Sequence, residues 1–115
     1  MILVVDDDAQ IREYYTSALR MYGYDVVAAP DGSAALEIIK HMAPGLVVLD
    51  LDMPRVDGWT VLRELAARES TRAVPVIVVT GEENADQIEG AAAACRKPVP
   101  VERLLSLVAS YQRAA

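Results

Sequence analysis

The sequence predicts an α/β domain in which a parallel β-sheet carries helices on both faces. The first reason is that short, continuous apolar runs alternate with longer segments whose apolar residues recur at helical spacing. The second is that apolar runs pass directly into polar residues, as in "ILVVDDD" at 2–8, "LVVLDLD" at 46–52 and "VPVIVVTG" at 74–81. Parallel strands are buried on both faces, so their hydrophobicity is continuous rather than alternating.

The first half of the chain predicts two strands and two helices. Residues 2–5 form the first expected strand, and Asp8 is a candidate N-cap for a helix that Gly23 would end. The apolar positions of that helix are Ile11, Tyr14, Tyr15, Ala18, Leu19 and Tyr22. Residues 25–29 predict the second strand, and the turn at 30–33 leads into a second helix, closed by 44–45. Its apolar positions are Ala35, Leu36, Ile38, Ile39 and Met42.

The second half repeats this alternation less regularly. Residues 46–49 predict a third strand, a third helix begins near Gly58 and Trp59, and residues 74–79 predict a fourth strand. A weak helical stretch at 82–90 precedes the alanine run at 91–94, which by propensity alone favours helix. A last helix follows Pro100. The apolar positions of these two regular helices are Val61, Leu62 and Leu65, then Val101, Leu104, Leu105 and Val108.

Length and composition limit the classes of protein. A chain of 115 residues is expected to form a single domain, 1–115, without an effector domain. It has 11 Lys and Arg against 17 Asp and Glu, a net charge of −6, and no basic cluster, so direct nucleic-acid binding is not expected. No apolar run approaches the roughly 18 residues of a membrane span, and the start lacks a secretory signal. Cys95, the single cysteine, fits a reducing compartment. We therefore expect a cytoplasmic protein without membrane contact.

Polar residues gather at one edge of the predicted sheet. Right-handed crossovers bring the carboxyl ends of parallel strands to the same edge, where open α/β sheets bind ligands. The residues delivered there are Asp6, Asp7, Asp8, Asp50, Asp52, Thr80 and Lys97. Clustered carboxylates repel, and Mg²⁺, which prefers oxygen ligands, removes that penalty. A carboxylate can also accept a phosphoryl group as an acyl phosphate, whose oxygens metal, ammonium and hydroxyl groups would neutralise.

Four segments together carry a family resemblance. "ILVVDDD", "LVVLDLDMPRVDGW", "VPVIVVTG" and "CRKPV", in this order, resemble the response-regulator receiver domain of two-component signalling over essentially the whole chain. The resemblance implies a flavodoxin-like, doubly wound sheet of five parallel strands in the order 2-1-3-4-5. It also implies a strand, not a helix, near residues 94–96. A histidine kinase or a phosphotransfer protein would be the partner that supplies phosphate, and the output partner is unknown.

The resemblance assigns a role to each site residue. Asp50 would be the phosphoacceptor, with Thr80 contacting the phosphoryl group and Lys97 pairing with it. Asp6, Asp7, Asp50 and the main-chain carbonyl of Asp52 would bind Mg²⁺. The side chains of Asp52 and Glu82 would tune the lifetime of the phosphate. Such a protein is not an enzyme that turns over a separate substrate, because its only reaction is autocatalytic transfer to and slow release from its own aspartate.

The sequence departs from the family pattern after the fourth strand. Ala94 stands where receivers commonly carry the aromatic residue whose rotation accompanies activation. The interval between Thr80 and Lys97 is several residues shorter than usual, which predicts a shortened fourth helix at 82–90. That stretch contains one large apolar residue, Ile88, and the acids Glu82, Glu83, Asp86 and Glu89. We therefore expect an atypical output face and a monomer or weak dimer.

Two other functions compete with this interpretation. "VVLDLD" also resembles the nucleophile motif of haloacid-dehalogenase-like phosphatases, but these need a second acidic pair after the lysine. Beyond Lys97 the only acidic residue of the chain is Glu102. The other alternative is a degenerate receiver that serves only as a binding module. The complete set of site residues argues against this alternative.

Overall fold

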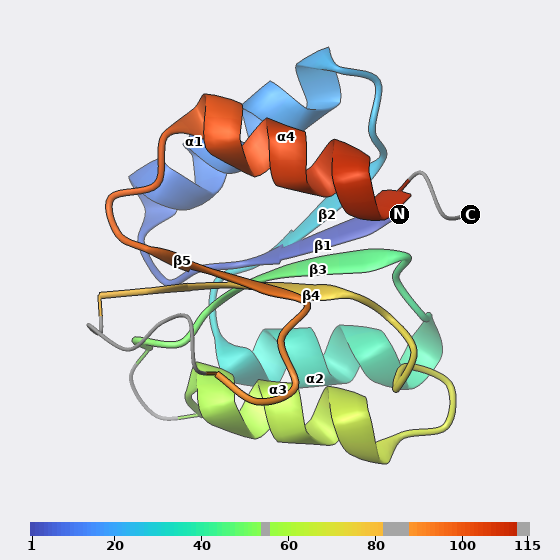
Figure 1. The fold of residues 1–115 in the computed structure, drawn as a ribbon. Coiled ribbons are helices and arrows are strands. Elements are labelled where there is room, and N and C mark those ends of the chain that lie inside the picture. The colour runs from blue at the N-terminus through green and yellow to red at the C-terminus, as the bar shows by residue number, and fades with distance from the viewer. Residues whose placement is uncertain (54–55, 82–87, 113–115) are drawn as a thin grey trace.

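The computed structural model describes residues 1–53, 56–81 and 88–112. Its centre is a sheet of five parallel strands in the order β2-β1-β3-β4-β5, shown in Figure 1. The strands are β1 (Ile2–Val5), β2 (Val26–Ala29), β3 (Leu46–Asp50), β4 (Val76–Thr80) and β5 (Ala93–Arg96). The helices are α1 (Ala9–Met21), α2 (Gly32–His41), α3 (Gly58–Ala67) and α4 (Val101–Gln112). The predicted doubly wound topology is confirmed.

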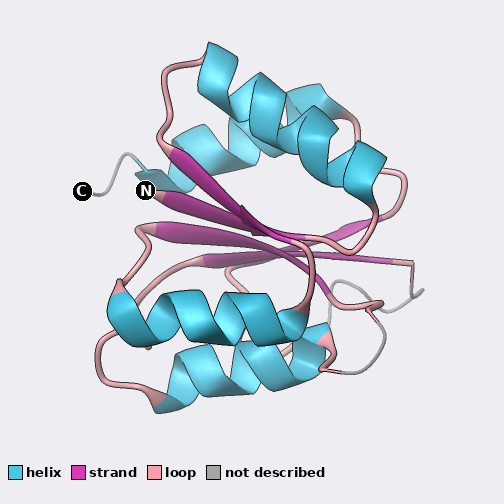
Figure 2. Ribbon diagram, turned by 180° about the vertical axis from the view of Figure 1, so that it is seen from behind, coloured by secondary structure: helices cyan, strands magenta, loops and turns pink. Residues whose placement is uncertain are grey.

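Helices cover both faces of the sheet. α2 and α3 lie side by side on one face, and α1 and α4 lie side by side on the other, as Figures 1 and 2 show from opposite sides. The order of the strands requires this arrangement, because right-handed crossovers place helices on one face when the chain moves one way and on the other face after it reverses. The reversal occurs at β1 and β3, in the middle of the sheet.

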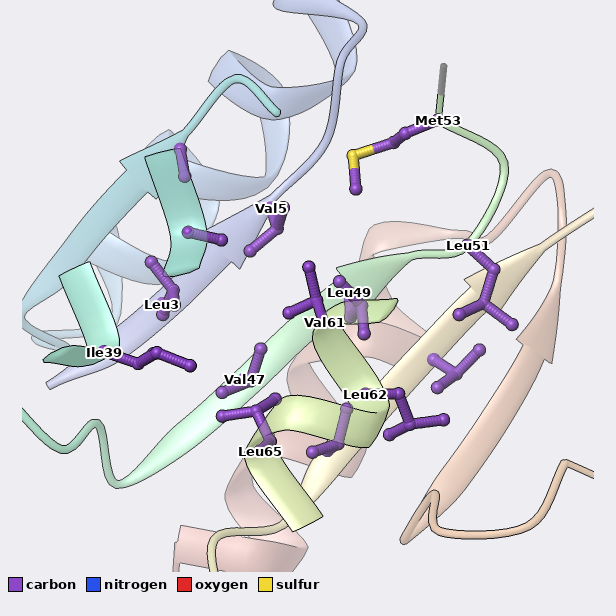
Figure 3. Packing of buried hydrophobic residues seen from close by; sticks show 14 residues of the cluster. Leu3, Val5, Ile39, Val47, Leu49, Leu51, Met53, Val61, Leu62 and Leu65 are labelled. Carbon is purple, nitrogen blue, oxygen red and sulfur yellow. The ribbon is translucent and has the colours of Figure 1, made fainter. Parts of the chain in front are cut away.

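Two separate hydrophobic cores result. Along β1, Leu3 and Val5 face α2 and α3, whereas Ile2 and Val4 face the opposite layer, because successive side chains of a strand point to opposite faces. The first core, drawn in Figure 3, comprises Leu3, Val5, Ala29, Ala35, Ile39, Val47, Leu49, Leu51, Met53, Val61, Leu62, Leu65, Val76 and Val78. The second comprises Ile2, Val4, Tyr15, Leu19, Val26, Leu46, Val48, Ile77, Val79, Cys95, Val99, Leu104 and Val108.

The strand boundaries differ slightly from those predicted. β2 begins at Val26 rather than at residue 25, and β3 continues through Asp50. β4 is shifted to Val76–Thr80, since its first predicted residues, Val74 and Pro75, precede the paired segment. Hydrogen bonds to neighbouring strands decide where each strand ends, and hydrophobicity alone does not reveal these bonds. Asp50 pairs with Val79, and Thr80 pairs with Arg96. Asp50 and Thr80 are therefore part of the sheet, although both are polar.

The alanine-rich segment 91–94 contributes to a strand. Ala93–Arg96 pairs with β4 over its whole length, as the resemblance implied and against the helix propensity of alanine. Of the preceding stretch, expected to form a short helix at 82–90, residues 82–87 lie outside the described part. The described residues 88–92 contain no helix.

Aspartates begin three of the helices. Asp8 accepts hydrogen bonds from the amides of Gln10 and Ile11, Asp31 from that of Ala34, and Asp57 from that of Thr60. Each satisfies N–H groups that have no partner within the helix. Gly23, with φ of +90°, follows α1 as expected.

In two helices, some residues predicted to lie on the buried face are exposed. In α1, Tyr15 and Leu19 are buried, but Tyr14 and Tyr22 are 56% and 68% exposed. In α2, Met42 lies just beyond the last helical residue and is also exposed. Within the described residues, no helix is both long and apolar enough to cross a bilayer.

Candidate functional site

The predicted site residues lie at the carboxyl edge of the sheet. Asp6 follows β1, Asp50 ends β3, Thr80 ends β4, and Lys97 follows β5. Main-chain hydrogen bonds continue past the strands here: the amide of Asp6 donates to Ala29, that of Leu51 to Val79, and that of Lys97 to Thr80. The sheet therefore fixes the backbone that carries these side chains.

Asp50 is at the centre of the site and is almost completely buried, with 1% exposure. Its Oδ1 accepts two hydrogen bonds of 2.9 Å, one from the Nζ of Lys97 and one from the amide of Asp52. Its Oδ2 is buried and has no hydrogen-bond partner among the described residues. A buried carboxylate oxygen without a partner is costly in a folded protein, so this atom is the one most suited to a ligand.

Asp6 and Asp7 lie beside Asp50. Each of the three offers a carboxylate oxygen, and these oxygens all lie within 4.8 Å of one another. Asp6 is buried and accepts a hydrogen bond from the amide of Asp8, whereas Asp7 is exposed. Burial, opposed by that hydrogen bond and reinforced by repulsion from Asp50, raises the pKa of Asp6 to about 6. The pKa of Asp50 is raised as well, again chiefly through burial.

Lys97 is the cation of the site. Burial alone would lower its pKa, but its hydrogen bond with Asp50 and the attraction of Asp50, Asp6 and Asp52 together raise it. Its Nζ lies 2.9 Å from Oδ1 of Asp50 and 3.7 Å from Oδ2 of Asp52. The ammonium therefore stays charged and lies between two carboxylates.

The side chain of Asp52 turns toward the end of β4. Its Oδ1 accepts a hydrogen bond of 3.0 Å from the hydroxyl of Thr80, and its Oδ2 accepts one of 2.7 Å from the amide of Gly81. The sequence indicated a role for the main-chain carbonyl of Asp52 and placed its side chain near the site, but did not predict these contacts. Glu82, the other acid expected there, lies outside the described residues.

Two supporting contacts, one made by Arg12 and one by Gly58, were not predicted from the sequence. The guanidinium of Arg12 donates a 2.8 Å hydrogen bond to the main-chain carbonyl of Asp6 and so ties α1 to the end of β1. Gly58, at the start of α3, lies against the main chain of Asp50 and Leu51, where a Cβ atom would clash with the carbonyl oxygen of Asp50. For Gly58, the sequence did offer a signal, because a glycine stands at the first position of the predicted helix. Nothing in the sequence shows which way Arg12 points.

The residues present fit a hard divalent cation. Three carboxylate oxygens lie close together, the pKa of Asp6 and Asp50 is raised, and Oδ2 of Asp50 has no protein partner within the described ranges. Oxygen ligands of this kind suit Mg²⁺, which would relieve the repulsion. The same edge holds an ammonium, a hydroxyl and a main-chain amide, donors that suit the oxygens of a phosphoryl group.

The chain is similar to known receiver domains in sequence and in fold. The family model described as "Response regulator receiver domain" matches residues 2–109. The "Probable transcriptional regulator ycf27" of Porphyridium aerugineum is 48% identical over 77% of the chain and 36% of its own length. The signal receiver domain of a signal transduction histidine kinase from Syntrophus aciditrophicus superimposes with a TM-score of 0.91 at 26% identity, covering 99% of this chain and 90% of that one. The response regulator TrrA of Thermotoga maritima, solved in complex with Mg²⁺ and BeF, gives 0.85 at 27% identity, covering 96% of each chain.

Proposed function

The chain belongs to the response regulator receiver domain family of two-component signalling, and on this premise we propose that Asp50 accepts a phosphoryl group from a histidine kinase, a phosphotransfer protein or a small phosphodonor. The observation that carries the proposal is the buried carboxylate of Asp50. One of its oxygens is held by Lys97 and by the amide of Asp52, while the other has no hydrogen-bond partner in the described part of the chain. The engaged oxygen orients the group, and the other is available for reaction.

In the proposed transfer, an Asp50 oxygen attacks phosphorus while the bond from phosphorus to the donor breaks. The donor, an imidazole nitrogen or an acyl oxygen, leaves with the electron pair of that bond, and Asp50 becomes an acyl phosphate. Lys97 and Thr80 would contact the phosphoryl oxygens. Asp6, Asp7, Asp50 and the main-chain carbonyl of Asp52 would hold Mg²⁺, which when bound neutralises charge on the carboxylates and the phosphoryl oxygens.

In the release step, water is the nucleophile and Asp50 is the leaving group. Water attacks phosphorus, the bond from phosphorus to Asp50 breaks, the carboxylate keeps the electron pair of that bond, and inorganic phosphate leaves with the protons of the water. The protein would thus take one phosphate per chain and lose it slowly. We propose that Asp52 and Glu82 influence the rate of this step.

The relatives support this proposal and extend it. TrrA was solved with Mg²⁺ and BeF, a phosphoryl mimic, which supports Mg²⁺ as the cofactor here. The chain spans about half the length or less of the curated relatives that it matches. Some of these relatives are named transcriptional regulators. A link to transcription is therefore a property of those longer proteins, and we do not assign it to the receiver domain itself. The match of the receiver model to residues 2–109 and the strand order favour a receiver over a haloacid-dehalogenase-like phosphatase.

The test is labelling with acetyl phosphate followed by intact-protein mass spectrometry. The expected result is one labile phosphate per chain, formed only with Mg²⁺ and absent from Asp50→Asn. The matched control is Asp57→Asn, which makes the same change at an aspartate whose carboxylate accepts hydrogen bonds from Thr60 and caps α3. Undiminished labelling of Asp50→Asn would disprove the assignment of the acceptor. A folded wild-type protein that takes no label from acetyl phosphate or from a histidine kinase would instead support the binding-only alternative.

A further inference from the structure

The carboxylate of Asp52 joins two groups of the neighbouring strand end. Its Oδ1 accepts a hydrogen bond from the Thr80 hydroxyl at 3.0 Å, and its Oδ2 accepts one from the Gly81 amide at 2.7 Å. The same Oδ2 lies 3.7 Å from the ammonium of Lys97. One carboxylate is therefore in contact with a hydroxyl, a main-chain amide and an ammonium.

These contacts coincide with the anion-binding groups of the proposed reaction. Thr80 and Lys97 are the residues that would contact the phosphoryl oxygens, and the Gly81 amide points to the same space because it shares an acceptor with Thr80. Two carboxylate oxygens resemble two phosphoryl oxygens in charge and in hydrogen-bonding capacity. A carboxylate and a phosphoryl group at these donors would exclude each other, by volume and by like charge.

We propose that the Asp52 side chain is an internal occupant of the phosphoryl-binding position and must turn away before Asp50 is phosphorylated. The inference rests on the proposed function and adds to it a residue that controls the state of the site. It also gives the Asp52 side chain a role before phosphorylation, separate from its proposed influence on phosphate release.

The surroundings of Asp52 allow this movement. Its side chain is 36% exposed, so a path to solvent exists for the displaced carboxylate. Its amide donates to Oδ1 of Asp50 at 2.9 Å, which holds the main chain in place while the side chain rotates. Displacement therefore requires a change of rotamer and the loss of two hydrogen bonds, without any shift of β3.

Occupation by the Asp52 carboxylate should lower the affinity of the site for a phosphoryl mimic. If the occupied form makes up about nine tenths of the protein, the apparent affinity for a phosphoryl mimic is reduced about tenfold, because only the open fraction binds. Hydrogen bonds to a charged acceptor are strong enough for such a ratio. Removing the carboxylate should restore the full affinity.

The experiment compares wild-type protein with Asp52→Ala by NMR, before and during titration with beryllofluoride at saturating Mg²⁺. In ligand-free protein, the Gly81 amide proton should move upfield in Asp52→Ala, because it loses its carboxylate acceptor. The dissociation constant for beryllofluoride should fall about tenfold. Asp52→Asn, which keeps one acceptor oxygen and loses the charge, should lie between the two. Glu69→Gln, which removes one negative charge from the turn after α3, should match wild type.

A second pair of variants separates occupation from a general effect of charge. In a Thr80→Ala background one of the two hydrogen bonds is already absent, so the gain from Asp52→Ala should be clearly smaller than in wild type. An equal gain in both backgrounds, or an equal or weaker affinity of Asp52→Ala for beryllofluoride, would overturn the inference while leaving phosphorylation of Asp50 intact. Failure of both wild type and Asp52→Ala to bind beryllofluoride would overturn the proposed function, and with it this inference.

Discussion

The ammonium of Lys97 lies 2.9 Å from Oδ1 of Asp50, so the loop after β5 contributes the cation that compensates the buried acid at the end of β3. In Lys97→Met, that carboxylate loses its cation and a hydrogen bond. We expect the free energy of unfolding to fall by about 2 kcal/mol, less than for a fully buried pair because Lys97 is partly exposed. Urea unfolding at pH 7 measures this.

The matched control is the double variant Asp50→Asn/Lys97→Met. With the charge of Asp50 already removed, the loss of the lysine should cost clearly less than it does in wild type. Equal costs in the two backgrounds would mean that the two side chains do not interact.

Gly58→Ala should destabilise the protein although alanine favours helices. An alanine Cβ at this position would clash with the carbonyl oxygen of Asp50. We expect a loss of about 2 kcal/mol from overpacking and slower labelling of Asp50, whose main chain must move. Gly45→Ala is the control, since its Cβ would make only ordinary contacts at 3.6 Å. Thermal unfolding of both variants distinguishes the two sites, and a Gly58→Ala protein as stable as wild type would contradict the close approach.

Asp57 should stabilise α3 in a pH-dependent way. Its pKa is lowered, chiefly by the hydrogen bond from the Thr60 amide. A lowered pKa means that the charged form contributes stability above the ordinary value of 3.8, and that this contribution disappears as the pH falls through the lowered value. Asp57→Ala should lose about 1 kcal/mol at pH 7. In Asp57→Asn, which keeps the cap but not the charge, the deficit relative to wild type should shrink in acid. Urea unfolding between neutral and acidic pH tests this, and a deficit that does not change with pH would contradict it.

Activation should not create a tight dimer through the segment between β4 and β5. Ala94 pairs with Val78 and offers no aromatic ring to rotate. Ile88 is partly buried against the first core rather than displayed to a partner. Sedimentation with Mg²⁺ and beryllofluoride should therefore show a monomer or a weak dimer. A tight dimer that forms only with the mimic and is lost in Ile88→Ala or Glu89→Lys would show that this segment serves as an output face.

The sequence predicted the elements of the fold better than the directions of side chains. Continuous apolar runs such as Ile2–Val5 and the aspartate before α1 are local signals, and both were confirmed. A strand near residues 94–96 was predicted through the family resemblance alone. The observed strand is Ala93–Arg96, whose hydrogen bonds to β4 override the helix propensity of alanine. Tyr14 and Tyr15 are adjacent and chemically alike, so only packing decides that Tyr15 is buried.

The same limit applies to the site. Strand ends and crossover handedness bring Asp6, Asp50, Thr80 and Lys97 to one edge, and the structure places them there. The orientation of the Asp52 carboxylate depends on a side-chain torsion and on two donors that are distant in sequence, about which the local sequence carries no information. The contact of Arg12 with the carbonyl of Asp6 was missed for the same reason.

The hydrogen bonds that extend beyond the strands also determine how the site responds to hydrogen exchange. The amides of Leu51 and Lys97 donate to Val79 and Thr80 and are therefore rungs of the central sheet. Protons of this kind exchange through opening of the most stable cooperative unit. The main chain next to Asp50, the proposed phosphoacceptor, and the main chain at Lys97 should thus be as slow to exchange as the core, although both positions resemble loops in the sequence. In the proposed reaction, Asp50 would then receive a phosphoryl group through movements of side chains such as that of Asp52, while the sheet beneath stays closed.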